Sequence, residues 1–290
     1  MYGSPGEHLF VAKNGWIWAY RDTVRFYDGT KWHSPIPDNV AYPIRAVSET
    51  SDGLIWISSS SLIHYNSQTD RLETVIQPEP VPTSTTELSR DEGRRSNRWI
   101  FGPVFEAADG ALWFNKPLSG IVRWKRDSNL MSAWGADDGF DGFEPVPTKF
   151  IQATDGSIWV GTLTGVYRFH DGVWQSWRLP NEGPKSRDMD DFSVLDMMED
   201  SEGKIWVVFQ RAGVMFWDSV RWNIVGPFEY PNGNRPQSVF QSSSGAIWIG
   251  FMDRDTVKYT QGRLWRYPTN IGTFLAACRR GNLSPCLWVF

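Results

Sequence analysis

The sequence has few of the side chains that most metal and nucleophilic centres use. Its 290 residues include only two cysteines and four histidines. The histidines are His8, His33, His64 and His170. They fall on different expected strands or turns, and no two have the spacing of a metal-ligand pair. We therefore predict no metal site and no cofactor.

Short catalytic motifs are also missing. The sequence contains no Gly-x-Ser-x-Gly elbow, no phosphate-binding loop and no His-Glu-x-x-His motif. The acidic run DDGFDGFE (137–144) resembles the start of a calcium loop. Counting from Asp137, however, the twelfth residue is Thr148, where such a loop needs a glutamate. We interpret the run as a polar turn and predict no catalytic residues.

The chain has neither a basic excess nor a long apolar run. A net charge of −4 does not favour nucleic acid or an anionic membrane surface as a partner. No apolar run approaches the ~18 residues of a membrane helix, so we expect no membrane insertion in this segment. The opening residues, MYGSPGEHLFVAK, lack the basic-then-apolar plan of a signal peptide. The chain is then either cytosolic or a mature or trimmed piece of a longer protein.

Tryptophan, glycine and proline are abundant, with 17, 26 and 18 copies, and this composition indicates many short strands joined by tight turns. A Gly-x-apolar-Trp pattern, or a close variant, recurs along the chain. Its tryptophans are Trp18, Trp56, Trp113, Trp159, Trp206, Trp248 and, in a looser copy, Trp288. The spacings are 38, 57, 46, 47, 42 and 40 residues. A period of about 40–50 residues is typical of propeller blades.

Each unit carries signals for four strands. After each of the first six tryptophans comes a triplet that usually reads apolar, basic, aromatic, such as Tyr167-Arg168-Phe169. This alternation indicates a strand with two different faces. An Asp-Gly-type turn and another Trp-bearing strand often follow, and an apolar stretch precedes each unit. We predict an all-β protein, a β-propeller of four-stranded antiparallel blades, in which the repeated tryptophans fill the wedge between neighbouring sheets.

Two charged columns recur with the repeat, and recurrence argues for structural roles because a catalytic pair is needed only once. The acidic column before the core glycine is Asp52, Asp109, Asp155 and Glu202, which we interpret as turn formers. The basic column includes Arg25, Arg123 and Arg168. We expect these arginines to snorkel or to pair with neighbouring blades.

The end of the chain departs from a complete ring. Six units carry all four strands, and a seventh has only FLAACR and CLWVF. We predict a single propeller domain over 1–290, seven-bladed with an incomplete last blade. The alternatives are a six-bladed ring with an appended hairpin and a fragment of a longer propeller. Because natural proteins avoid an open sheet edge, missing sequence or a partner, such as a second copy in a dimer, would cover it.

Two further features fall between or after the full units. The run QPEPVPTSTTELSRDEGRRSNR (77–98) is rich in Pro, Ser, Thr and charge, and we expect an inserted loop between the second and third blades. It is either a plain surface loop or a lid or docking loop. Cys278 and Cys286 flank a short turn, so a disulfide between them and a pair of buried thiols are both open.

The run DGFDGFEPVPTKFIQATDGSIWVGTLTGVYRFHDGVW (138–174) resembles the two-component regulator propeller repeat. The matching elements are the Asp-Gly-aromatic lead, the Asp-Gly-x-Ile-Trp-Val-Gly-Thr core and the Gly-Val-x-Arg-Phe strand. The resemblance implies a seven-bladed propeller from the extracellular or periplasmic sensor part of a hybrid histidine kinase. It therefore implies a periplasmic or extracellular location and a role in signal transduction.

Ligand-binding residues are expected where the repeats differ. The loops that enter each innermost strand and those that join the second and third strands share one face of a propeller. Mixed polar groups around such a channel mouth suit small polar ligands such as sugars, and the alternative is a set of solvated loops. The candidates are Arg21, Arg45, Lys116, Lys149, Thr164, Asp196, Arg211, Gln237, Arg254 and Thr273.

These observations favour a non-catalytic binding or sensory module. Its ligand would be carbohydrate-like, another small polar molecule or a protein partner. One alternative is a structural scaffold for protein interactions. Another is a propeller lyase or hydrolase resembling the streptogramin lyases, for which Glu7, His8 and Asp196 are the nearby candidate residues.

Overall fold

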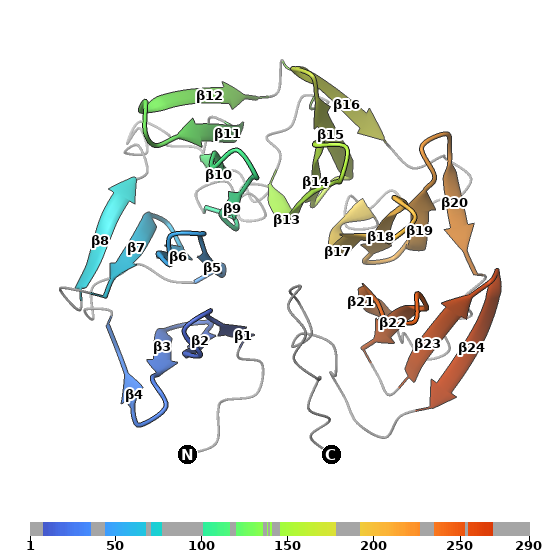
Figure 1. Ribbon diagram of the computed structural model, residues 1–290, viewed down its shortest axis with the longest axis horizontal. Helices are drawn as coiled ribbons and strands as arrows, with labels where there is room; N and C mark the ends of the chain where they lie inside the picture. Colours follow the sequence, from blue (N-terminus) through green and yellow to red (C-terminus); the bar gives the residue numbers. More distant parts are fainter. Residues whose placement is uncertain are drawn as a thin grey trace, which may run out of the picture. The chain divides into compact units, whose positions relative to one another are not determined.

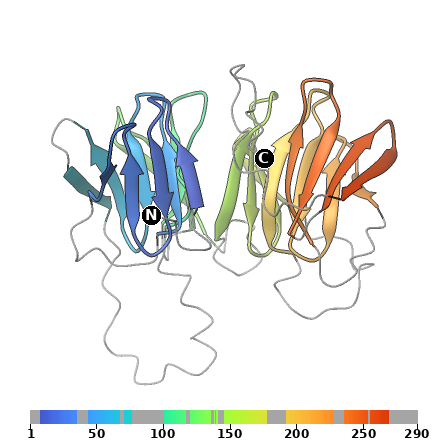
Figure 2. The same ribbon diagram turned by 90° about the horizontal axis from the view of Figure 1, so that it is seen from below.

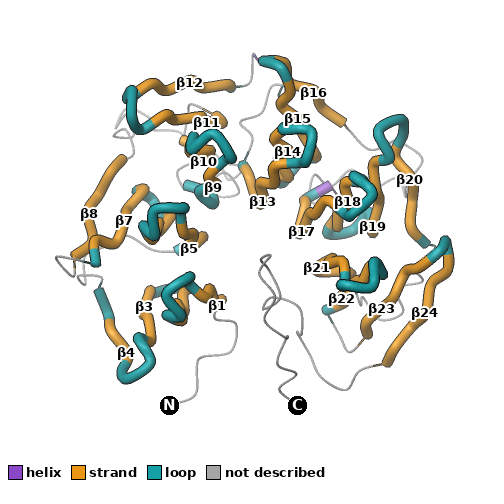
Figure 3. The backbone as a smooth tube through the Cα atoms, viewed as in Figure 1, coloured by secondary structure: helices purple, strands orange, loops and turns teal. Residues whose placement is uncertain are grey.

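Short β-strands joined by tight turns make up the computed structural model. It describes residues 8–35, 44–67, 71–76, 101–116, 120–135, 138, 140, 146–177, 192–226, 235–252 and 255–268. These residues hold 24 strands (Figures 1 and 3) and no α-helix, and the short helical segment that Figure 3 draws beside β17 is 3₁₀, at Phe192. The chain divides into two compact units, Met1–Phe150 and Ile151–Phe290, and the boundary falls within strand β13.

Unit 1 holds three four-stranded sheets, which we call the first, second and third blades. The first blade is β1 (His8–Val11), β2 (Ile17–Tyr20), β3 (Val24–Tyr27) and β4 (Trp32–His33). The second is β5 (Ala46–Glu49), β6 (Ile55–Ser58), β7 (Leu62–Asn66) and β8 (Arg71–Ile76). The third is β9 (Phe105–Glu106), β10 (Leu112–Lys116), β11 (Gly120–Lys125) and β12 (Leu130–Trp134).

Three more sheets form the fourth, fifth and sixth blades, and apart from the start of β13 they lie in unit 2. The fourth is β13 (Pro147–Gln152), β14 (Ile158–Thr162), β15 (Val166–His170) and β16 (Val173–Trp177). The fifth is β17 (Val194–Glu199), β18 (Ile205–Phe209), β19 (Gly213–Trp217) and β20 (Trp222–Val225). The sixth is β21 (Pro236–Gln241), β22 (Ile247–Phe251), β23 (Asp255–Thr260) and β24 (Arg263–Pro268).

Within every sheet the strands follow one another in chain order, as an antiparallel meander requires (Figure 1), and Figure 2 shows successive strands joined by short turns at alternate ends. The six predicted four-stranded units are therefore confirmed as sheets. The repeated turn between the first two strands depends on its glycine. Gly53 and Gly156 have φ of 82° and 84°, which only glycine adopts without cost, and a Cβ at either site would meet no atom within 4 Å. The glycine is needed for its backbone conformation and not for space.

The repeated tryptophans form the interblade cores. Five of them, Trp18, Trp56, Trp113, Trp159 and Trp206, are at most 2% exposed. In the clusters that lie inside one unit, each packs against the next blade along the chain; Trp206, for example, contacts the group that contains Ile249 and Val257. A buried indole removes about 150–250 Å² from water, worth about 4–6 kcal/mol as an upper estimate. Trp18, Trp56, Trp159 and Trp206 therefore lie between neighbouring blade sheets.

The first blade departs from the predicted column. In the second to sixth blades the core tryptophan faces the middle residue of the triplet, as Trp159 faces Arg168. In the first blade Trp18 faces Phe26, and Arg25 faces Ala19 instead. A register shift of one residue moves a side chain to the opposite face. Our alignment of Arg25 with the basic column was therefore wrong, and Arg25 instead lies over the ring of Trp32, with its guanidinium carbon 5.1 Å from the centroid.

The other two arginines of the basic column make different contacts from those expected. Arg123 donates to Asp109, and Arg168 donates to Asp155 at 2.6 Å. Each pair joins a turn to a strand of the same blade, so the expected pairing with a neighbouring blade was wrong for these residues. Strand register explains these ion pairs. The turn aspartate precedes the core tryptophan by four residues, and the arginine lies directly opposite that tryptophan on the next strand. The aspartate carboxylate therefore reaches the arginine of its own blade.

Several predictions fall outside the described residues. They are the inserted loop at 77–98, Cys278, Cys286, Trp288 and the incomplete seventh blade, and they stay predictions. Trp248, the core tryptophan of the sixth blade, is only partly buried, and its ring lies 5.4 Å from that of Tyr267.

Candidate ligand-binding pocket

A repeated hydrogen-bonded contact joins consecutive blades at the turn between their first two strands. In each contact, the first strand of one blade ends in a Glu or Gln. The side-chain oxygen of that residue accepts a hydrogen bond from a backbone N–H in the turn of the preceding blade. We call this contact the interblade clamp. Its pairs are Glu49 with Lys13, Glu106 with Ser51, Glu199 with Thr154 and Gln241 with Ser201.

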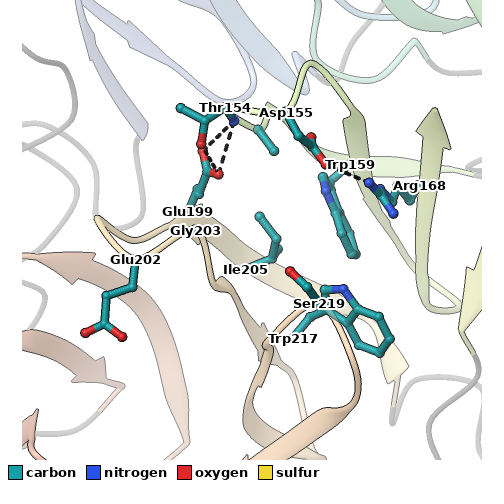
Figure 4. Close-up of a pocket in the computed structure, with 11 residues that line it drawn as sticks. Thr154, Asp155, Trp159, Arg168, Glu199, Glu202, Gly203, Ile205, Trp217 and Ser219 are labelled. Atoms are coloured by element: carbon teal, nitrogen blue, oxygen red, sulfur yellow. Dashed lines mark hydrogen bonds and ion pairs between the residues drawn. The ribbon is translucent and has the colours of Figure 1, made fainter. Parts of the chain in front are cut away.

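One clamp borders a pocket inside unit 2. The pocket has a volume of about 230 Å³ and lies between the fourth and fifth blades (Figure 4). Its walls come from the β13–β14 turn, from β14 and β15, and from the β17–β18 and β19–β20 turns with their flanking strands. The lining residues are Ala153, Thr154, Asp155, Trp159, Arg168, Glu199, Glu202, Gly203, Ile205, Trp217 and Ser219.

Asp155 is held ionised by its turn. Its Oδ1 accepts the N–H of Ser157 at 2.9 Å and the hydroxyl of the same serine at 2.5 Å. Its Oδ2 lies 2.6 Å from Nη2 of Arg168. Burial acts to raise the pKa of Asp155, but the hydrogen bonds from Ser157 and the charge of Arg168 outweigh it and hold that pKa below its usual range. The pocket therefore contains a fixed carboxylate–guanidinium pair.

Glu199 supplies a second carboxylate on the wall opposite Asp155. Its Oε1 and Oε2 lie 3.1 and 2.8 Å from the backbone N of Thr154, and the threonine hydroxyl also donates to Oε1. Figure 4 shows the Glu199 carboxylate directed at Thr154, whereas the Glu202 side chain points away from the pocket. Lys204 pairs with Glu202. Glu199 is thus positioned on the pocket wall, and among the described residues no cationic side chain contacts it.

Two indoles complete the walls. Trp159 is 2% exposed, and the guanidinium carbon of Arg168 lies 5.6 Å from its ring centroid. Trp217 belongs to the same aromatic cluster through Trp177 and Trp222, at centroid separations of 5.1 and 5.7 Å. Because packed neighbours hold both rings, this wall of the pocket is preformed rather than assembled around a ligand.

Three predicted channel-mouth residues of unit 2, Thr164, Arg211 and Gln237, lie at the end of the strands opposite the pocket. Thr164 sits in the β14–β15 loop, where its N–H donates to Oγ1 of Thr162 at 3.1 Å, whereas the pocket lies at the β13–β14 turn. Gln237 and Arg211 are exposed at the same end of their blades as this loop. As ligand-binding residues, Thr164, Gln237 and Arg211 stay predictions.

Asp196 is placed differently from the other candidates. It is 5% exposed, its Oδ1 accepts the N–H of Met197 at 2.8 Å, and its Oδ2 accepts the N–H of Val239 in the sixth blade at 3.1 Å. This carboxylate joins two blades. Such contacts give Asp196 a structural function that does not depend on a ligand.

The candidates of unit 1 lie in loops and at strand ends. Arg21 and Arg45 are exposed, and the carbonyl of Arg21 accepts the N–H of Ile44, so the loops of the first and second blades meet there. Lys116 ends β10, and Lys149 lies in β13. Arg254 and Thr273 fall outside the described residues. Of the three residues named for the catalytic alternative, Glu7 also lies outside the described residues, and His8 stacks on Tyr20 with ring centroids 5.3 Å apart.

Sequence reasoning missed the pocket although it named several of its parts. Trp159, Asp155 and Arg168 were assigned to the scaffold because they recur, and Glu199 and Ser219 were not singled out. The sequence signal that could have revealed the pocket is that corresponding positions in different copies of the repeat carry different residue types. Across the described ranges, no group of three or more His, Cys, Asp or Glu side chains lies close enough to hold a metal. The same ranges contain no helix with the length and apolar character needed to cross a bilayer.

Comparison with known proteins identifies the fold. No model of a known protein family matches the chain, and no curated protein matches it. Among solved structures, virginiamycin B lyase from Staphylococcus aureus is similar with a TM-score of 0.64 at 13% identity, over 92% of this chain and 85% of that one. YCF48 bound to a D1 peptide is similar with a TM-score of 0.58 at 12% identity, over 92% and 85% of the two chains.

A third similar structure is the extracellular domain of a putative hybrid two-component system from B. thetaiotaomicron. Its TM-score is 0.65 at 17% identity, and the match covers 92% of this chain but only 34% of that one. At such identities the likeness shows the fold alone. The chain is therefore an all-β protein with a β-propeller fold, as predicted, and its function rests on its own residues.

Proposed function

We propose that this chain is a non-catalytic ligand-binding or sensory β-propeller module. The observation that carries the proposal is the pocket between the fourth and fifth blades. There a held carboxylate, Glu199, and the Asp155–Arg168 pair face an aromatic wall. Concave sites with a few fixed polar groups against aromatic walls are the usual form of small-molecule sites. The proposed ligand is a small polar molecule or a polar side chain of a protein partner.

Location and mode of action belong to the same proposal. The resemblance to sensor propeller repeats, together with the fold shared with an extracellular two-component domain, supports a place outside the cytoplasm. A ligand in this pocket would contact two blades at once, because its walls come from both. Such a ligand stabilises the arrangement in which the two blades are packed and shifts any equilibrium that involves their separation.

The test is a thermal-shift screen of the purified chain against sugars, amino acids, polyamines and short peptides. A ligand at 100 times its dissociation constant stabilises the folded state by about 2.7 kcal/mol, which raises the unfolding midpoint measurably. Each hit is then incubated with the protein and analysed by mass spectrometry. The proposal expects hits that are recovered unchanged. Conversion of a hit to a product would support the lyase or hydrolase alternative, and a screen without hits would favour the scaffold alternative.

A further inference from the structure

The interblade junction that contains the pocket has a counterpart inside unit 1. Strand register aligns the junction of the second and third blades with that of the fourth and fifth. Asp52 corresponds to Asp155 in the turn, and Glu106 corresponds to Glu199 in the clamp. The aromatic residues also correspond, Trp56 to Trp159 on the strand after the turn and Trp124 to Trp217 on the facing blade.

In the unit 1 junction an arginine occupies the space beside both carboxylates. Arg126 follows Trp124 by two residues, in the turn after β11. Its Nη1 lies 2.8 Å from Oδ2 of Asp52, and its Nη2 lies 3.7 Å from Oε1 of Glu106. The turn carboxylate and the clamp carboxylate therefore form a guanidinium site, which the chain fills with its own side chain.

In the unit 2 junction the corresponding residue cannot reach that space. Two residues after Trp217 stands Ser219, whose side chain is short and uncharged, and the pocket of about 230 Å³ opens there. Arg168 pairs with Asp155, but it belongs to the same blade as Asp155, whereas Arg126 comes from the blade that faces Asp52. In the second blade the position of Arg168 is held by His64. The clamp carboxylate of Glu199 keeps Thr154 as its partner and has no counterpart of Arg126.

Charge and shape both favour a cation in this space. Counting Asp155, Arg168 and Glu199, the charged groups directed into the pocket sum to one negative charge. The indole of Trp217, which is only partly buried, presents aromatic surface, which attracts a planar guanidinium. A guanidinium also matches carboxylate geometry with paired N–H donors, which an ammonium group does not.

We propose that this pocket binds a guanidinium group at the place that Arg126 occupies in the unit 1 junction, with Glu199 as its main acceptor and Asp155 as a second one. The proposal rests on the proposed function and names its ligand class. The group is carried either by a small free molecule or by an arginine side chain of a peptide. Both sources share the same chemistry, and the experiment below separates them.

The experiment is calorimetric titration of the purified chain with three probes. They are methylguanidine, the peptide acetyl-Gly-Arg-Gly-amide, and the same peptide with citrulline, which is nearly isosteric with arginine but uncharged. We expect the arginine peptide to bind about tenfold or more tightly than the citrulline peptide, because a hydrogen bond to a charged group is worth about 1.5–3 kcal/mol. If methylguanidine binds as well as the arginine peptide, the ligand is a free small molecule. If the peptide binds more tightly, the ligand is an arginine side chain.

Two variants locate the binding. Glu199→Gln keeps an acceptor for the clamp, since Gln241 makes the same contact in the sixth blade, but it removes the charge; binding should fall about tenfold or more with little change in unfolding temperature. Ser219→Arg should supply an internal guanidinium and abolish binding. The matched control is Glu106→Gln, in the junction that Arg126 already fills, and it should leave binding unchanged.

A reciprocal variant gives an independent readout. Arg126→Ser should open a second site in the unit 1 junction and raise the stoichiometry of the arginine peptide from one to two. Equal binding of the arginine and citrulline peptides would overturn the proposal, as would binding that survives Glu199→Gln. If the arginine probes do not bind while another compound in the screen does, the ligand class is wrong and the binding function stands. If nothing in the screen binds, both the guanidinium ligand class and the proposed binding function are wrong.

Discussion

Oδ2 of Asp52 lies 2.8 Å from Nη1 of Arg126, although 74 residues of chain separate the two. The pair joins the turn of the second blade to a turn of the third. Burial acts to raise the pKa of Asp52, but the hydrogen bonds from Thr50 and Arg126 outweigh it and keep that pKa below its usual range. The blades of unit 1 are therefore connected by charge as well as by their tryptophan cores.

Removing this ion pair should cost little stability. The Arg126 and Asp52 side chains are 27% and 41% exposed, so solvent screens their attraction. A double-mutant cycle with Arg126→Ser and Asp52→Asn should give a coupling free energy of about 0.2–1 kcal/mol, measured by urea unfolding. The coupling should shrink at high salt. A coupling above about 2 kcal/mol would show that the pair is far less screened than its exposure indicates.

The interblade clamp should tolerate an amide but not an alanine. Glu199→Ala removes the acceptor of the Thr154 N–H and hydroxyl, and it should lower the free energy of unfolding by about 1–2 kcal/mol. Glu199→Gln should stay within about 0.5 kcal/mol of the wild type. The reason is in the sixth blade, where Gln241 accepts the N–H of Ser201 at 2.8 Å and donates to its hydroxyl at 3.0 Å. Equal destabilisation by both substitutions would show that the charge, not the hydrogen bonding, matters.

Close packing between the fourth and fifth blades should make Gly161 intolerant of a side chain. A Cβ on Gly161 would lie 2.5 Å from Cγ1 and 2.8 Å from Cβ of Val194, which is fully buried. Gly161→Ala should therefore cost about 1–3 kcal/mol in chemical unfolding. Val194→Ala removes the contact with Cγ1 and leaves the one with Cβ, so it relieves part of the clash, and the double variant should be more stable than the sum of the single effects predicts. Strict additivity would mean that the clash is relieved elsewhere.

Asp218 should stabilise the fold in a pH-dependent way. The N–H of Arg221, the amide of Asn223 and the N–H of Val220 all donate to its carboxylate and lower its pKa to about 2. A folded-state pKa below the unfolded value contributes stability that is present above the unfolded value, near 4, and lost as the pH falls through about 2. The unfolding free energies of wild type and Asp218→Asn should therefore converge as the pH drops from 5 to 2.

The direct measurement for Asp218 is its carboxyl NMR titration. Asn223→Ala removes one donor, so the midpoint should move upward from about 2 while the two backbone donors remain. A wild-type midpoint near the ordinary aspartate value would contradict the turn geometry around this carboxylate.

Much of the fold was predictable because the repeat is local. Each Asp-Gly-type turn and each Gly-x-apolar-Trp core lies within a few residues, so strand positions and buried tryptophans such as Trp56 and Trp159 follow from short-range pattern. The exception is the first blade, where the step from Trp18 to its partner Phe26 is one residue longer than our alignment of the triplets, which paired Trp18 with Arg25, allowed. Register depends on how each loop closes, and the residue types on either side of the loop do not specify it.

The candidate pocket was not predictable in the same way. Its lining comes from the fourth blade (residues 153–168) and the fifth blade (residues 199–219), and these stretches meet only because the two blades pack face to face. The same turn aspartate is paired by an arginine of the facing blade at Asp52 and by one of its own blade at Asp155. By itself the amino-acid sequence determined an all-β repeat with tryptophan wedges, since hydrophobic period and turn chemistry act over a few residues. Only the tertiary structure decided which carboxylate received an arginine and where a cavity remained, because side-chain reach across a junction depends on packing between sheets.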